Sequence, residues 1–212
     1  MCIRDSKRLA HLPETEFIRA DVLTSDFGLK SKPAASTVYN PGPPLMDVLR
    51  ARNQTQCDII VSNPPYISPK AFNKDTSRSA RNFEPKLALV PPELQGLASF
   101  ADEQGDIFYP ALLRTASAIG AKIAFFEIAD LDQAYRVAQM AGRAGWDDAE
   151  IWRDAPGKSA QNHERKSTGE FRIMGTGNVR SVICWKAEYG GWVGKSPTAK
   201  YENWKDEYHA GA

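Results

Sequence analysis

The sequence is 212 residues long, which is enough for one sizeable domain with a hydrophobic core of its own. Apolar residues make up 42% of it and charged residues 25%, as is ordinary for a globular protein. Its 27 basic and 26 acidic side chains give no electrostatic reason to expect a nucleic-acid or membrane partner, and no apolar run approaches the roughly 20 residues of a membrane helix.

The first quarter of the chain predicts little regular structure. Residues 1 to 6 fit nothing that follows and match the translation of a transposon adapter used in sequencing libraries, so we expect them to be non-native. Residues 16 to 21 predict a short strand that ends in the acidic Asp21. Residues 24 to 43 are rich in Ser, Pro, Gly and Asn, which predicts an irregular loop, and residues 45 to 52 predict a short helix.

Residues 57 to 67, Cys-Asp-Ile-Ile-Val-Ser-Asn-Pro-Pro-Tyr-Ile, combine an apolar run with an abrupt stop. The β-branched residues 59 to 61 pack well on a pleated surface, which predicts a short interior strand. Pro64 and Pro65 have no N–H to donate, so neither a helix nor a strand ladder continues through them. The strand is therefore expected to end at Asn63, with a stiff backbone and a flat aromatic ring directly after it.

The remainder of the chain predicts alternating helices and strands. Residues 68 to 100 carry many polar, Pro and Gly residues and are expected to be mostly irregular, with short helical turns. Further elements are expected over residues 106–120 (helix), 121–128 (strand), 130–145 (helix, capped by Asp130), 148–152 (strand) and 179–185 (strand). This alternation predicts an α/β fold with parallel strands, closed by an antiparallel pair of strands at the sheet edge. Residues 153–170 are expected to form an exposed insertion, and residues 188–212 a loosely held tail.

The cysteines and two neighbouring glycines predict no additional site. Cys2, Cys57 and Cys184 show no paired spacing, so neither a disulfide framework nor a zinc site is predicted, and we expect no metal. Cys57 and Cys184 lie in strand-like runs and are expected to act as small buried hydrophobes. Gly175 and Gly177 lie between two strand-like runs, which favours a hairpin turn over a cofactor-binding loop.

The Asn63-Pro64-Pro65-Tyr66 motif is expected at a strand's carboxyl end, which is where ligands bind in doubly wound sheets. Its residue types fit methyl transfer to a planar nitrogen, whose delocalised lone pair makes it a poor nucleophile. The Asn63 side-chain oxygen and the Pro64 carbonyl group can accept both N–H bonds of that nitrogen and orient it. Pro65 keeps the backbone stiff, and Tyr66 can stack on the flat acceptor group and favour a nearby sulfonium charge.

The same residues also permit a simpler interpretation, in which Asn-Pro-Pro is a turn that only ends a strand. Asn before Pro is a common start of a turn. Asn-Pro-Pro-Tyr directly after three β-branched residues is a more specific combination, and it favours the catalytic interpretation.

The motif resembles the signature of the class I S-adenosylmethionine-dependent methyltransferases that act on amino groups. Within that group the chain is similar to the HemK-type N5-glutamine methyltransferases of peptide chain release factors. Further resemblance is carried by residues 83–89, 105–109, 125–128 and 180–182. The resemblance covers about residues 16 to 186, and the insertions are similar to those of fungal mitochondrial members.

The resemblance implies a Rossmann-like class I methyltransferase sheet and transfer of a methyl group from S-adenosylmethionine to the side-chain amide nitrogen of a glutamine. It implies that the partner is a peptide chain release factor with a Gly-Gly-Gln loop, in the mitochondrion, with the cytoplasm as the alternative. Asn63, Pro64, Pro65 and Tyr66 would form the catalytic motif. Asp21 would contact the adenine of the cofactor, and Asn63 would also lie against the cofactor.

The sequence departs from this family in ways that bear on activity. Pro91 and Pro92 stand where the family has Gly-Gly. The first strands and the Gly-rich loop that holds the methionine part of the cofactor are not found, so residues 7 to 187 are expected to be the C-terminal part of a methyltransferase domain with an incomplete sheet. Two other functions stay open: N-methylation of a base in DNA or RNA, which uses the same motif, and a catalytically inactive methyltransferase fragment. The near-neutral charge weighs against a nucleic-acid substrate.

Overall fold

The computed structural model describes residues 16–24, 42–92, 104–158 and 171–186. The expectations for residues 1–6 and 188–212 lie outside these ranges, as do most of those for residues 24–43 and 153–170. The chain divides into two compact units, Met1–Gln54 with Pro65–Phe108 and Thr55–Pro64 with Tyr109–Ala212. No helix within the described ranges is long and apolar enough to span a membrane.

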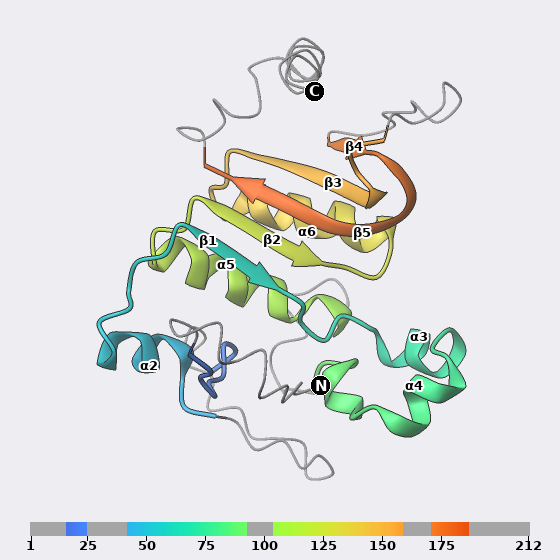
Figure 1. The fold of residues 1–212 in the computed structure, drawn as a ribbon, viewed down its shortest axis with the longest axis horizontal. Coiled ribbons are helices and arrows are strands. Elements are labelled where there is room, and N and C mark those ends of the chain that lie inside the picture. The colour runs from blue at the N-terminus through green and yellow to red at the C-terminus, as the bar shows by residue number, and fades with distance from the viewer. Residues whose placement is uncertain (1–15, 25–41, 93–103, 159–170, 187–212) are drawn as a thin grey trace, which may run out of the picture. The chain divides into compact units, whose positions relative to one another are not determined.

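A five-stranded sheet forms the centre of the second unit (Figure 1). Its strands are β1 (Ile59–Ser62), β2 (Ile123–Glu127), β3 (Asp148–Ala155), β4 (Arg172–Met174) and β5 (Thr176–Trp185). They lie in the order β1-β2-β5-β3-β4 across the sheet. Because helices alternate with these strands along the chain, the predicted α/β class is confirmed.

β1 and β2 are adjacent parallel strands, paired from Ile59 with Ile123 to Ser62 with Phe126. Helix α5 (Phe108–Ala118) precedes β2 directly, as a crossover between parallel strands requires. Gly120 follows this helix with a φ of 69°, which glycine adopts without a steric penalty. The predicted parallel pairing is therefore confirmed, and Asn63 comes directly after the carboxyl end of β1.

β5 lies inside the sheet, between β2 and β3, and runs antiparallel to both. The predicted antiparallel pairing of the last two long strands is confirmed, but their predicted place at the sheet edge is wrong. The residues from Val182 to Trp185 are all buried, so β5 is covered on both of its faces there. The short β4 occupies the edge instead and pairs in parallel with β3.

The chain passes from β4 to β5 around the end of β3. The hairpin predicted at Gly175 and Gly177 is wrong, because β4 and β5 lie on opposite sides of β3. A Cβ atom on Gly175 would stand 2.2 Å from the Ala155 carbonyl oxygen and 2.4 Å from the Cα atom of Pro156. Gly175 also has a φ of 84°, so both the close passage and the backbone angle require glycine.

Helices α5 and α6 (Leu131–Arg143) cover one face of the sheet and lie behind it in Figure 1. The Tyr109 ring of α5 packs edge-on against Phe126 of β2, with ring centres 5.9 Å apart. Asp130 caps α6 as predicted, since its Oδ1 accepts the Gln133 N–H at 2.8 Å. On the covered face, the central strands β2, β3 and β5 contribute the buried residues Ala124, Phe126, Ala149, Ile151, Val182 and Cys184. The hydrophobic core of this unit therefore lies between the sheet and the two helices.

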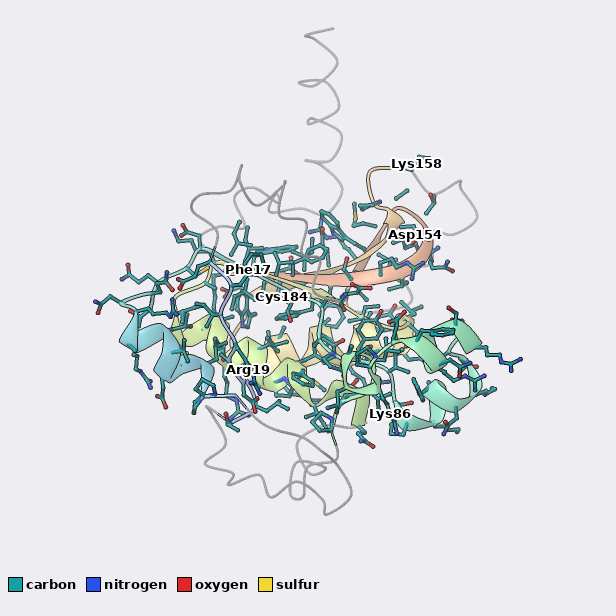
Figure 2. The ribbon with its side chains drawn as sticks, turned by 60° about the horizontal axis from the view of Figure 1, so that its bottom comes forward. Phe17, Arg19, Lys86, Asp154, Lys158 and Cys184 are labelled. Atoms are coloured by element: carbon teal, nitrogen blue, oxygen red, sulfur yellow. The ribbon has the colours of Figure 1, made fainter. Side chains whose placement is uncertain are left out.

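The two cysteines in the described ranges differ in their surroundings. Cys184 is fully buried on the covered face of the sheet (Figure 2), and this burial raises the pKa of its thiol to about 12. Cys57 is exposed, and its Sγ donates to the Ile59 carbonyl oxygen at 2.8 Å. The prediction of a buried Cys57 is therefore wrong, because β1 begins only at Ile59.

The other face of the sheet is partly polar. Glu150 is buried, with its Oε1 2.6 Å from Arg172 Nη2 and its Oε2 accepting from Trp152 Nε1 at 3.0 Å. These partners compensate the cost of burying the carboxylate. At the β1 end of the same face, Ile59 and Val61 remain 53% and 73% exposed.

The first unit is built from short helices: α2 (Leu45–Ala51), α3 (Pro69–Lys74), α4 (Arg78–Phe83), and the 3₁₀ helices η1 (Lys86–Ala88) and η2 (Gln104–Asp106). α2 confirms the helix predicted over residues 45–52. The strand predicted over residues 16–21 is wrong, because only Asp21 pairs, in an isolated bridge with Pro44. The Asp21 N–H donates to Pro43 and its carbonyl group accepts from Leu45, both at 2.8 Å. The rest of that stretch has no ladder partner and stays irregular.

Candidate active site

Asn63 is the first residue beyond the end of β1. Ser62 is the last paired residue of that strand and lies opposite Phe126. Pro64 has no N–H, so the ladder does not extend past Asn63. Asn63 is exposed whereas Pro64 is buried. A buried, stiff backbone therefore supports an amide side chain that is accessible to another molecule.

The second half of the motif, Pro65 and Tyr66, belongs to the first unit, and both residues are half-buried. The following Ile67 donates its N–H to the Leu89 carbonyl group at 2.9 Å. Leu89 is the last residue of the stretch 83–89, so a backbone hydrogen bond joins this stretch to the residue that follows the motif. That bond fixes the chain directly after Tyr66.

A buried polar clamp holds the loop that follows β2. The Tyr109 hydroxyl group donates to the Glu127 carbonyl oxygen at 2.9 Å and lies 3.5 Å from Gln133 Oε1. The same Gln133 oxygen accepts the Ala129 N–H at 2.8 Å. Tyr109 and Gln133 are almost completely buried, at 0% and 2% exposure, so water has little access to the side-chain ends of these hydrogen bonds.

The clamped loop is a neighbour of Asn63 in the sheet. Because Ser62 pairs with Phe126 in a parallel ladder, Asn63 and Glu127 follow equivalent positions of β1 and β2. Glu127 is half-buried at this strand end. The clamp therefore stiffens the part of the second unit beside the exposed amide.

Neither Tyr109 nor Gln133 was expected at the site from sequence. Two features of the sequence point to these residues. Asp130 and Gln133 have the spacing of a helix capping box, in which a Gln side chain reaches back to an N–H group at the helix start. A tyrosine on the apolar side of a helix also needs a partner for its hydroxyl group.

Asp21, the predicted adenine contact, lies in the first unit and is 7% exposed. Its Oδ1 accepts the Leu23 N–H at 2.8 Å, which makes a local turn after the bridge to Pro44. The carboxylate is thus held in a fixed orientation by the backbone. This geometry is that of a turn at the end of an extended stretch. The contact of Asp21 with the adenine of a cofactor stays a prediction.

Two other kinds of site find little support in the described residues. Within the described ranges, no group of three or more His, Cys, Asp or Glu side chains is arranged to hold a metal ion. Gly175 and Gly177 form the passage from β4 to β5, where Gly175 approaches the Ala155 backbone too closely for any side chain. The close approach and the backbone angle at Gly175 are explained by the fold itself.

One curated protein shares a short similar stretch with this chain. Over 33 residues, the chain is 54% identical to the mitochondrial MRF1 N(5)-glutamine methyltransferase MTQ1 of Saccharomyces cerevisiae. The match covers 16% of this chain and 10% of the length of that protein. No family model matches the chain. This partial similarity supports a methyltransferase, and the five-stranded α/β sheet is compatible with a Rossmann-like methyltransferase fold.

Proposed function

We propose that this chain belongs to an enzyme that transfers a methyl group from S-adenosylmethionine to the side-chain amide nitrogen of a glutamine in a peptide chain release factor. The observation that carries the proposal is the exposed Asn63 at the carboxyl end of β1, followed by the buried Pro64. The short similarity to a yeast mitochondrial N5-glutamine methyltransferase supports the same reaction class and a mitochondrial location. The cytoplasm is the alternative compartment.

The protein's part in this reaction is to orient the acceptor. An amide nitrogen shares its lone pair with the carbonyl group, so it is a weak nucleophile until it becomes pyramidal. The Asn63 side-chain oxygen and the Pro64 carbonyl oxygen accept its two N–H bonds and aim the lone pair at the methyl carbon. Tyr66 stacks on the flat amide, and Pro65 limits the backbone movement of both neighbours. As the new N–C bond forms, the bond between the methyl carbon and the sulfonium sulfur breaks. The amide proton then leaves to water, so the site needs no strong base.

S-adenosylmethionine would supply an electrophilic methyl group, and the described residues fit part of its binding site. The Asp21 carboxylate is buried and held by the Leu23 N–H, which suits a fixed contact to an adenine amino group. Asn63, at the end of β1, would lie against the cofactor as well as the acceptor. A glycine-rich backbone cradle for the methionine end is not found among the described residues.

Methylation of a base in DNA or RNA is the second candidate, because an exocyclic amine has the same planar nitrogen. A cluster of exposed basic residues between 65 and 92 is the observation that favours it. A catalytically inactive methyltransferase fragment is the third. The three proposals predict different products and can be separated in one assay.

The assay uses protein expressed from the full reading frame, with cofactor labelled in its methyl group. The substrates are a mitochondrial release factor, the same factor with the Gly-Gly-Gln glutamine changed to leucine, and a mixed DNA and RNA fraction. We expect label only in the unchanged release factor. Label in nucleic acid alone would replace the first proposal by the second. The 212-residue chain is assayed in parallel, and no label from it in any substrate would favour the inactive fragment.

A further inference from the structure

The helical segment after the Asn-Pro-Pro-Tyr motif carries an uneven share of the charge. Residues 65–92 hold five basic and two acidic side chains, a net charge of +3, in a chain whose total is +1. The remainder of the chain is therefore net acidic, at −2. The five basic residues are Lys70, Lys74, Arg78, Arg81 and Lys86, and all of them are exposed.

The same segment has no buried side chain in any of its helices. None of the residues of α3, α4 or η1 is buried, and Phe83 and Leu87 are 85% and 42% exposed. Short helices in proteins are normally stabilised by packing an apolar face against a core. Aromatic and Arg side chains are enriched where proteins bind one another, so an exposed Phe among cations indicates a binding surface.

Local hydrogen bonds keep the segment ordered despite its exposure. Ser68 caps α3 by accepting the Ala71 N–H, and Ser77 caps α4 by accepting the Ala80 N–H, both at 3.2 Å. Arg81 Nη1 then donates to the Asn73 carbonyl oxygen at 2.9 Å and joins α4 to α3.

A second contact joins η1 to α3. The Lys86 Nζ lies 5.8 Å from the centre of the Phe72 ring, so the cation stands over an aromatic face (Figure 2 labels Lys86). A pre-ordered surface loses little entropy when a partner binds to it, which favours its use in recognition.

We propose that α3, α4 and η1 form a docking surface for an acidic protein surface next to the target glutamine of the substrate; this inference rests on the proposed function. The surface, called here the basic docking surface, consists of Lys70, Lys74, Arg78, Phe83 and Leu87. Lys70 follows Tyr66 by four residues within the same unit, a span of at most about 14 Å. A substrate bound to the surface therefore has its reactive loop within a short distance of the motif.

A protein fits this surface better than RNA does. Phe83 and Leu87 need an apolar partner in addition to the charges around them, and an acidic protein surface can supply both. No ion pair within the described residues engages any of the five cations. Arg81 and Lys86 make contacts inside the segment, so Lys70, Lys74 and Arg78 are assigned to the surface. Even five cations neutralise few phosphates, and nucleic-acid affinity depends on many such contacts.

The test measures equilibrium binding of the chain to a fluorescent mitochondrial release factor without cofactor. The variant is Lys70→Glu/Arg78→Glu, whose glutamates stand in the first turns of α3 and α4, where a helix tolerates negative charge. The matched control is Arg143→Glu/Lys158→Glu, which makes the same change in net charge at exposed positions of the second unit. Circular dichroism checks that both variants are folded.

We expect the docking variant to bind the release factor about ten-fold more weakly, and the control to bind within about two-fold of the unchanged chain. Raising the salt concentration from about 50 mM to about 300 mM should weaken the unchanged chain more than the docking variant. Phe83→Ser should weaken binding at both salt concentrations, because it removes apolar contact rather than charge.

Equal binding by the docking variant and the unchanged chain would overturn the inference. So would tighter, charge-dependent binding to an RNA oligonucleotide, which would make the surface a nucleic-acid site. A release factor with its target glutamine changed to leucine should still bind. If this factor binds but no glutamine methylation is found, the docking surface is supported and the proposed reaction is contradicted. If glutamine is methylated but binding does not depend on these charges, the reaction is supported and the docking surface is contradicted.

Discussion

The proposed chemistry depends first on the side-chain amide of Asn63. Replacing Asn63 by Ala removes one of the two acceptors that aim the glutamine nitrogen. Loss of one oriented transition-state hydrogen bond costs about 3 kcal/mol, or about 100-fold in kcat. We expect the affinity for S-adenosylmethionine to change little, because other residues provide most of the cofactor contacts. Steady-state methylation kinetics and calorimetry on the same preparation check both expectations.

A matched control is available on α6. Gln139→Ala removes an exposed amide of similar size, and Ala suits a helix, so kcat should stay within about two-fold. If Asn63→Ala retains nearly full glutamine methylation, Asn63 does not orient the acceptor.

Tyr66 is expected to act on substrate binding as well as on rate. Stacking is present in the ground state and in the transition state, so Tyr66→Ala should raise KM and lower kcat. Tyr66→Phe keeps the ring and should stay close to the unchanged enzyme. A Phe variant as poor as the Ala variant would show that the hydroxyl group matters and that stacking is the wrong explanation.

Some residue positions were predictable and others were not. Asn63 was placed correctly because β-branched residues before two prolines leave few alternatives to a strand that stops. Cys57 was misjudged because an apolar run does not show where its first hydrogen bond forms, and β1 begins two residues later. Tyr109 was seen only as part of a helix, since its partner, the Glu127 carbonyl group, lies 18 residues away.

At the level of elements, the Tyr109 clamp gives a test of how the loop after β2 is held. Tyr109→Phe keeps the ring contact with Phe126 and removes the hydroxyl group from the Glu127 carbonyl oxygen. We expect a loss of about 1 to 2 kcal/mol in the free energy of unfolding, because a partly buried carbonyl group loses a hydrogen-bond partner. Amide hydrogen exchange of residues 127–130 should accelerate more than that of β2.

Tyr135 offers the control for this change. Its ring lies 6.4 Å from that of Phe171 and is half-buried on the same helix as Gln133. Tyr135→Phe should leave both the urea midpoint and the exchange rates of residues 127–130 nearly unchanged. Equal effects of the two substitutions would argue against a specific clamp.

Cys184 reports on the opening of the sheet through its reactivity. Burial raises the pKa of its thiol from 9.0 to about 12, so the folded chain keeps the proton that the unfolded chain releases near pH 9. This contribution to stability is complete below pH 9 and is lost as the pH rises from 9 toward 12. Alkylation followed by peptide mapping should label Cys57 in the folded chain and Cys184 only after urea unfolding. Equal labelling of both at pH 8 would contradict the buried position.

The predicted helices and strands were wrong where the structure of a segment depends on the neighbouring segment with which it pairs. Residues 16–21 have the composition of a strand, yet only Asp21 finds a partner, so the backbone stays irregular. The glycines at 175 and 177 suit a hairpin, but the chain uses them to go around Ala155 and Pro156. Local sequence preference does not identify the neighbours that a strand will have.

For the whole molecule, the sequence predicts weak cofactor binding. The carboxylate of the cofactor's methionine part is bound by backbone N–H groups, which a glycine-rich loop at the start of a helix provides. No such loop is found in this sequence. We expect the 212-residue chain to bind S-adenosylmethionine with a dissociation constant well above the micromolar range. Calorimetry on the chain, beside an active methyltransferase as a positive control, tests this, and micromolar affinity would contradict it.

The overall class was predictable because alternating apolar strands and amphipathic helices leave few ways to bury both. The strand order was not predictable from the sequence. The buried end of β5 is apolar on both faces, and this pattern does not show which strands lie beside it. The division into two units was not predicted either, although it falls between Pro64 and Pro65 of the motif.

The central position of β5 has a consequence for the order in which the chain is assembled. A ribosome makes β1, β2 and β3 before β5. However, β2 and β3 do not pair with each other, because β5 lies between them in the sheet. Until residues 176–185 have left the exit tunnel, the edges of β2 and β3 that pair with β5 have no hydrogen-bonding partner. A premature stop before that strand would release both edges together, and such edges recruit other chains. Within the described residues, the strand that is made last is therefore the one that covers both exposed edges.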